Sequence, residues 1–74
     1  MISQEEVKEA VINGKMIEDY SQDTRGPSYL ILGKTNAGRN LHVVCAPKNE
    51  YLLIITSYVP NPAEWDIMFK KRKR

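Results

Sequence analysis

The chain has 74 residues, 42% of them hydrophobic and 27% charged, which is enough for one small domain and excludes a second core. A chain of this length buries only about 60% of its unfolded surface, so its core gives limited stability. The single cysteine excludes an internal disulfide. Tight packing or a partner subunit must supply the remaining stability, and we therefore expect a homodimer.

The net charge of +2 averages two different regions. The last five residues, KKRKR at 70–74, are all basic, whereas residues 1–69 hold six basic and nine acidic residues and carry a net charge of −3. We expect a single domain over residues 1–69 and a basic tail over 70–74. The mildly acidic body argues against a broad basic face for nucleic acid.

Neither the start of the sequence nor its longest apolar run resembles a targeting or membrane segment. The first residues, MISQEEVKEA, are acidic and polar, which predicts no signal peptide. The longest apolar run, YLLII at 51–55, is far shorter than the roughly 20 residues that span a bilayer. Together with the lone cysteine, these features predict a reduced, cytoplasmic protein that does not enter a membrane.

The stretch SQEEVKEAVINGK predicts a helix over about residues 4–13. Ser3 as the N-cap and Glu6 three residues later form a capping box. Apolar residues then recur at helical spacing on one face: Val7, Ala10 and Val11. Asn13 and Gly14 both tolerate the left-handed conformation, which predicts that the helix ends there.

Four short segments joined by turn residues predict an antiparallel meander. They are KMIEDY (15–20), SYLILG (28–33), RNLHVVCA (39–46) and YLLIITSYV (51–59). The charged residues of the first segment are typical of an edge strand. NPAEWDIMFKK then predicts a helix, with Asn61 as its cap and Pro62 at its first position. The expected fold class is α+β: an N-terminal helix, a four-stranded antiparallel meander sheet and a short C-terminal helix.

The turn PKNE at 47–50 predicts that Ala46 lies opposite Tyr51, which fixes the pairing of the last two strands. Side-chain alternation then separates two faces. One face carries His42, Val44, Ala46, Tyr51, Leu53 and Ile55. The other carries Leu41, Val43, Cys45, Leu52, Ile54, Thr56 and Tyr58, with Arg39 opposite Tyr58. Both faces are apolar, so we expect the N-terminal helix to cover one and the C-terminal segment or a second subunit to cover the other.

His42, the only histidine, lies in the run GRNLHVVCAP (38–47), and two interpretations of it stay open. In the first, it lies at the margin of the core and hydrogen-bonds a backbone carbonyl. In the second, it is a general acid or base, because the ordinary pKa of histidine is near neutrality. A separate polar set, Arg39, Thr56 and Tyr58, either holds a phosphate or carboxylate or forms a cross-strand pair in which Arg39 stacks on Tyr58.

Other chemistry-bearing residues are few. Cys45 has no basic neighbour in sequence, so we expect a buried, inert thiol. One histidine and one cysteine without a partner pair predict no metal site, and we expect no cofactor. Trp65 either anchors the last segment onto the sheet or stacks on a nucleobase. The tail residues either aid solubility or bind RNA phosphates: Lys70, Lys71, Arg72, Lys73 and Arg74.

The order of these pieces resembles the bacterial domain-of-unknown-function family 4258 over about residues 2–66. The resemblance rests on ISQEEVKEAVINGKMIEDY, PSYLILG, GRNLHVV and IITSYVPNPAEW. That family is similar to the RelE-like and BrnT-like toxin ribonucleases, in which an N-terminal helical part packs on a four-stranded antiparallel sheet. The resemblance therefore implies RNA cleavage, or descent from a protein that cleaved RNA, and a cognate antitoxin as a partner.

The resemblance also implies which residues correspond. The family's Gly-Arg-x-Leu-His motif falls on Gly38, Arg39, Leu41 and His42, and its Ile-Thr-x-Tyr motif falls on Ile55, Thr56 and Tyr58. The family usually has a preceding helix with a His-x-x-x-Arg element, which this sequence does not contain. Its absence removes acid, base and phosphate-binding groups and leaves one sheet face uncovered.

Two functions follow as alternatives. We favour a non-catalytic binding or dimerisation module on a RelE-like scaffold, because the body is acidic and the His-x-x-x-Arg helix is missing. The other is a metal-independent ribonuclease of a toxin–antitoxin pair, with His42 as base or acid, Arg39 on the phosphate and Tyr58 as an acid. Its RNA contacts are expected at Arg25, Arg39, Thr56, Trp65 and the basic tail. The ribonuclease requires an accessible His42 near Arg39 or Tyr58, whereas the module requires His42 buried or at a subunit contact.

Overall fold

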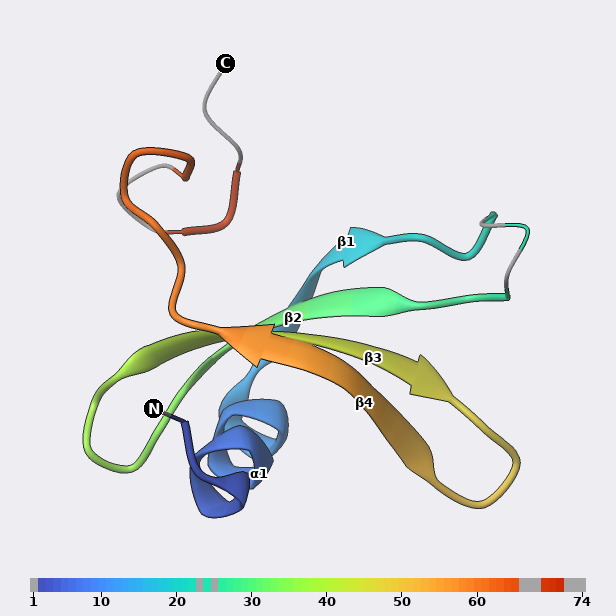
Figure 1. The fold of residues 1–74 in the computed structure, drawn as a ribbon, viewed down its shortest axis with the longest axis horizontal. Coiled ribbons are helices and arrows are strands. Elements are labelled where there is room, and N and C mark those ends of the chain that lie inside the picture. The colour runs from blue at the N-terminus through green and yellow to red at the C-terminus, as the bar shows by residue number, and fades with distance from the viewer. Residues whose placement is uncertain (1, 23, 25, 66–68, 72–74) are drawn as a thin grey trace.

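The computed structural model describes residues 2–22, 24, 26–65 and 69–71. In this part of the chain, helix α1 (Gln4–Asn13) precedes four strands: β1 (Lys15–Asp19), β2 (Tyr29–Lys34), β3 (Asn40–Pro47) and β4 (Leu52–Tyr58). The strands form one antiparallel sheet in the order β1-β2-β3-β4. Figure 1 shows α1 on one side of this sheet and the described residues that follow β4 on the other. The predicted N-terminal helix and antiparallel meander are confirmed.

The start of α1 follows the predicted capping box. The Ser3 hydroxyl accepts a hydrogen bond from the Glu6 N–H, and the Glu6 carboxylate accepts one from the Ser3 N–H, each at 3.1 Å. The helix ends at Asn13, but Gly14 is extended (φ −94°, ψ 176°), so the predicted left-handed cap is wrong. A glycine is needed at this position because a Cβ at Gly14 would lie 2.4 Å from the carbonyl oxygen of Ala10.

The core lies between α1 and one face of the sheet. Ala10, Leu41 and Val43 are fully buried at its centre, and four partly buried side chains pack around them: Ile2, Val7, Val11 and Ile31. Gly33 lies under the helix, and a Cβ there would lie 1.8 Å from the carbonyl oxygen of Ala10. Because Gly33 has no side chain, α1 approaches β2 closely. The N-terminal helix therefore covers one sheet face, as the sequence predicts.

The pairing of β3 with β4 differs from the predicted register. Ala46 pairs with Leu53 rather than with Tyr51, because the hairpin loop is residues 48–51 and the Lys48 N–H donates to the Tyr51 carbonyl at 2.8 Å. Further along, the register shifts between Val44 and Cys45, and Ile55 is the extra residue of a β-bulge.

This bulge reverses the faces predicted for the end of β4. Tyr58 pairs with His42 rather than with Arg39, so Tyr58 lies on the same face as His42. Thr56 pairs with Val44 and lies on that face too. The predictions that Tyr58 and Thr56 share the face of Leu41, and that Tyr58 lies opposite Arg39, are wrong because one extra residue shifts the alternation of every side chain beyond it.

Residues 59–71 follow β4 and are named the C-terminal segment. The described part of this segment contains a turn and does not show the predicted short helix. Asn61 acts as the expected cap: its side chain accepts from the Ala63 N–H at 2.9 Å, and its carbonyl accepts from Glu64 at 2.9 Å and Trp65 at 3.2 Å. The turn covers residues 62–64. Residues 66–68, where that helix was expected to continue, lie outside the described residues. No helix in the described ranges is long and apolar enough to cross a membrane.

Candidate functional site

His42 lies in the middle of β3 and is fully buried. Because Leu41 and Val43 pack against α1, alternation directs the imidazole to the opposite face. Its Nε2 lies 2.8 Å from the backbone carbonyl oxygen of Phe69. A carbonyl only accepts hydrogen bonds, so Nε2 carries the proton and donates it. This geometry confirms the interpretation of His42 as a packed side chain that hydrogen-bonds a backbone carbonyl, and its catalytic role stays a prediction.

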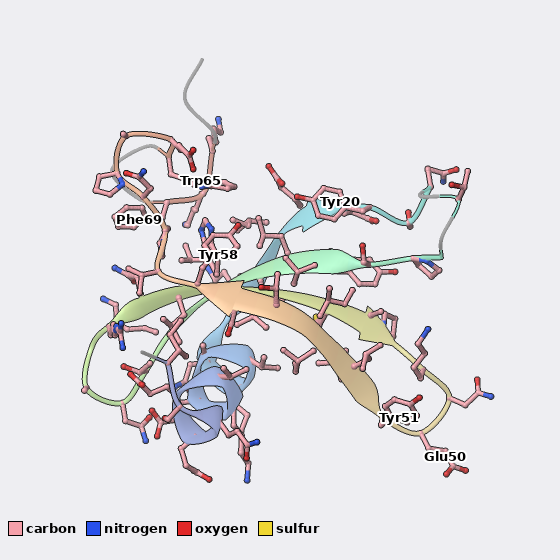
Figure 2. All side chains as sticks on the ribbon, viewed as in Figure 1. Tyr20, Glu50, Tyr51, Tyr58, Trp65 and Phe69 are labelled. Atoms are coloured by element: carbon pink, nitrogen blue, oxygen red, sulfur yellow. The ribbon has the colours of Figure 1, made fainter. Side chains whose placement is uncertain are left out.

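Two aromatic rings enclose this imidazole. The ring centroid of Trp65 lies 4.3 Å from that of His42, and the Tyr58 centroid lies 5.3 Å from it, both in edge-to-face geometry. Trp65 is only 2% exposed. Figure 2 shows Trp65, Phe69 and Tyr58 gathered on the side of the sheet away from α1. The prediction that Trp65 anchors the last segment onto the sheet is confirmed, and in this arrangement its ring is not open to a nucleobase.

Phe69 supplies the carbonyl with an uncommon backbone conformation. Its φ is 58°, in the left-handed region that bulky residues rarely adopt. Such strain persists only where surrounding contacts hold it. The hydrogen bond to His42 is a contact of this kind.

Arg39 lies on the other face and does not meet His42. Its Nη1 is 3.2 Å from Oε2 of Glu6, so the guanidinium connects the start of β3 to the first turn of α1. The pKa of Glu6 is held below its ordinary value of 4.5, first by the Ser3 N–H and then by the Arg39 hydrogen bond. The sequence predicted that Arg39 and His42 lie on opposite faces, and the structure confirms this.

The predicted catalytic and RNA-binding residues are therefore only partly together. Tyr58 meets His42, whereas Arg39 is held by Glu6 on the helix side. Thr56, Lys70 and Lys71 are exposed. Four residues expected to contact RNA lie outside the described residues: Arg25, Arg72, Lys73 and Arg74. The set Arg39, Thr56 and Tyr58, expected to hold an anion together, is not assembled, because the bulge in β4 moves Thr56 and Tyr58 to the other face.

The sequence interpretation missed one polar pair on the His42 face. Glu18 pairs with Leu30, which pairs with Val44, so the Glu18 side chain shares their face. Its carboxylate accepts a hydrogen bond from the Tyr20 hydroxyl. The spacing of these two residues in an extended segment was the available indication, because residues two apart on a strand point the same way.

Cys45 fits the expected inert thiol. It is 1% exposed, its Sγ lies 3.9 Å from the Tyr29 carbonyl oxygen, and burial raises the pKa of the thiol. A raised pKa leaves less of the reactive thiolate. Within the described ranges, no three His, Cys, Asp or Glu side chains gather where they could hold a metal ion.

Two hollows lie beside the sheet. One of about 470 Å³ is on the His42 face, beyond Val44, and is lined by Tyr20, Gly26, Pro27, Ser28, Val44, Ala46, Lys48, Leu53 and Ile55. The other, of about 580 Å³, lies between α1 and β4 and is lined by Gln4, Val7, Lys8, Val11, Ile12 and Ile54. Both linings are largely apolar, and both include side chains of β4.

β4 is an edge strand of the sheet, and its apolar side chains are exposed. In the described structure its neighbour is β3 on one side, and its other side is open. Residues 52–55, the β4 edge, are Leu-Leu-Ile-Ile with exposed fractions between 39% and 54%. Residues 51–60 contain no charge, whereas β1 at the opposite edge contains Lys15, Glu18 and Asp19. Only one of the two edges thus carries the charges that natural sheets use against pairing.

Comparison with known proteins gives one match. A family model described as "Domain of unknown function (DUF4258)" matches residues 1–59. This range contains α1 and all four strands, and Trp65 and Phe69 lie beyond it. No curated protein and no solved structure matches the chain significantly. Because the match covers most of its length, the chain belongs to the DUF4258 family.

Proposed function

We propose that the chain is a non-catalytic binding and dimerisation module on a RelE-like scaffold, and that two copies pair along their β4 strands. The observation that carries the proposal is the uncharged, exposed β4 edge. An open strand presents unpaired N–H and C=O groups that pair readily with another strand. A small domain that leaves four neighbouring large aliphatic side chains partly in water gains stability when a second copy covers them.

The symmetry of such a pair is simple. A two-fold axis normal to the sheet sets β4 antiparallel to the β4 of its partner and gives one continuous eight-stranded sheet, twice the four strands of one copy. The two α1 helices then lie on the same side of that sheet. Because the strand has no charge, no like charges oppose each other across the axis.

The hollow between α1 and β4 supports the same pairing. Ile54 lies at its edge, and Ile12, which is 71% exposed, lies on its helix side. Aliphatic side chains from the partner's strand, on the helix side of the extended sheet, reach this hollow. Both the strand edge and the adjacent apolar hollow are then covered by one contact.

The surroundings of His42 support a non-catalytic module. Proton transfer to a substrate requires contact with it, and His42 is fully buried under Trp65 with its Nε2 proton donated to Phe69. A reduced, cytoplasmic setting is part of the proposal, supported by the single cysteine and its burial.

The test is the mass of the protein in solution, measured by sedimentation velocity and by light scattering over a wide concentration range. We expect wild type to be a dimer and Ile55→Lys to be a monomer, because a lysine on the strand edge opposes pairing. Met16→Lys on β1 is the matched control, since Met16 is 57% exposed and Ile55 is 54% exposed. A monomeric wild type, or a dimer that both variants retain, contradicts pairing through β4.

The contact between His42 and Tyr58 favours a second candidate, the metal-independent ribonuclease with an antitoxin partner. This contact brings together two of the three predicted catalytic side chains on one face of the sheet. RNA cleavage in a metal chelator, measured for wild type and for Trp65→Ala, which removes the cover of His42, separates the two functions. Under the proposed function neither protein cleaves RNA. Cleavage by either, lost on adding His42→Ala, would establish the ribonuclease instead.

A further inference from the structure

We propose that the sheet face around His42 is a docking site for a tryptophan-bearing segment of a partner protein, and that the C-terminal segment occupies it as an intramolecular ligand. The site is made by residues of the family domain: Leu30, Leu32, His42, Val44 and Tyr58 share this face. The cover comes from residues beyond the 1–59 match, Trp65 and Phe69. The inference rests on this face and does not require the β4–β4 pairing, although Leu53 and Ile55 of β4 line the outer part of the face.

The contacts of the C-terminal segment indicate which chemical groups the site recognises. The Trp65 ring packs edge-to-face against His42, and the Phe69 carbonyl accepts the Nε2 proton. A buried N–H donor needs an acceptor, so an occupant of this face that keeps this tautomer must bring a hydrogen-bond acceptor to His42. A peptide meets both demands with one aromatic side chain and one backbone carbonyl.

The way in which the C-terminal segment is attached to the sheet has features of a ligand that a partner could displace. Among its described residues, 62–64 form a turn and Trp65 makes a single β-bridge, and none of them lies in a strand of the sheet. Phe69 brings its carbonyl to His42 only in a strained conformation, with φ 58°. Release of the segment relieves this strain, and an unstrained segment from another protein makes the same hydrogen bond without it.

The unfilled part of the same face points to a longer occupant than the C-terminal segment. The hollow of about 470 Å³ continues from Val44 over an apolar floor that includes Ala46, Leu53 and Ile55. Lys48 lies at this hollow, and Lys15 lies on the same face in the row with Leu32 and His42. The acid Glu18, also on this face, accepts a hydrogen bond from the Tyr20 hydroxyl. An occupant with acidic residues near its tryptophan fits this charge pattern, and Glu64 precedes Trp65 in the same way.

A peptide of residues 59–71, VPNPAEWDIMFKK, tests the site in full-length protein. Trp65 is the only tryptophan, so a Trp65→Ala chain has no tryptophan emission and the tryptophan fluorescence of the added peptide reports its burial. We expect a blue shift and saturable binding to Trp65→Ala. Wild type should bind at least tenfold more weakly, because its own segment competes at an effective concentration of roughly millimolar. A peptide with alanine at the tryptophan, followed by calorimetry, should lose binding by at least tenfold.

Two results of the peptide experiment would overturn the docking proposal. No binding to a folded Trp65→Ala chain up to about 1 mM peptide, within the range of the tethered segment's effective concentration, overturns the proposal. Equal binding to wild type and Trp65→Ala also overturns it. If Trp65→Ala does not fold, wild type labelled with 5-fluorotryptophan gives the answer: excess unlabelled peptide should create a second, solvent-exposed fluorine resonance that grows with its concentration. A single unchanged resonance contradicts the docking site, and sedimentation velocity reports the β4 dimer independently.

Discussion

Gly33 lies where α1 approaches the sheet closely, and Gly33→Ala should be among the most damaging single substitutions. The added Cβ would lie 1.8 Å from the Ala10 carbonyl oxygen, which is backbone and cannot rotate away. Overpacking of this kind costs about 1–3 kcal/mol, and we expect the upper end of that range, measured by urea unfolding.

Gly38→Ala is the matched comparison for Gly33→Ala. Gly38 has φ 88°, but a Cβ there has nothing within 4 Å. Its cost is then the left-handed conformation alone, about 1–2 kcal/mol. If Gly38→Ala destabilises the protein more than Gly33→Ala, the close helix–sheet contact is not what Gly33 provides.

Glu6 links the N-cap to Arg39, which predicts a pH dependence of stability. The Ser3 N–H and Arg39 lower the pKa of Glu6 in the folded chain below its ordinary value of 4.5. The unfolded chain therefore takes up the proton first, so this stabilisation is present above pH 4.5 and is lost as pH falls through the folded pKa. We expect Glu6→Gln to flatten the acid loss of stability. A Glu6→Gln profile identical to that of wild type would contradict the role of Glu6.

The sequence predicts the environment of His42 better than its partners. The apolar neighbours in LHVV indicate a packed side chain, and a buried imidazole needs a hydrogen-bond acceptor, so a backbone carbonyl was a sound expectation. That the carbonyl belongs to Phe69, 27 residues away, depends on how the C-terminal segment crosses the sheet. No local propensity carries that information.

At the scale of the element, α1 depends on its cap, because an isolated helix of ten residues is marginal in water. Ser3→Ala removes the acceptor of the Glu6 N–H, and we expect a loss of about 0.5–2 kcal/mol in the free energy of unfolding. Ser21→Ala, at an exposed turn position, is the control and should be within about 0.5 kcal/mol of wild type. Equal effects of the two substitutions would show that the cap does not stabilise the helix.

Local sequence patterns predict the bounds of the strands but not the register in which they pair. Their bounds follow from turn residues and alternation, so β1 to β4 lie close to the predicted segments. The pairing of β3 with β4 does not follow, because both strands are apolar on both faces and alternation alone does not fix the register. The bulge at Ile55 then decides that Tyr58 meets His42, and with it which candidate site residues share a face.

At the scale of the whole molecule, we propose pairing through the exposed β4 edge as a source of stability for a 74-residue chain whose described part has one helix and one sheet. If the proposed pairing is correct, folding and association are linked, and stability must depend on protein concentration. For a native dimer that unfolds to two chains, a tenfold rise in concentration adds about 1.4 kcal/mol per dimer to the apparent stability.

The dependence on concentration is therefore the prediction that tests the molecule as a whole. We expect the urea midpoint of wild type and of Met16→Lys to rise with protein concentration, because β4 is intact in both. The midpoint of Ile55→Lys should not change, since its charged edge prevents pairing while its fold remains. Circular dichroism over a wide concentration range measures all three. A wild-type midpoint independent of concentration would mean that the single chain is stable with its β4 edge in water.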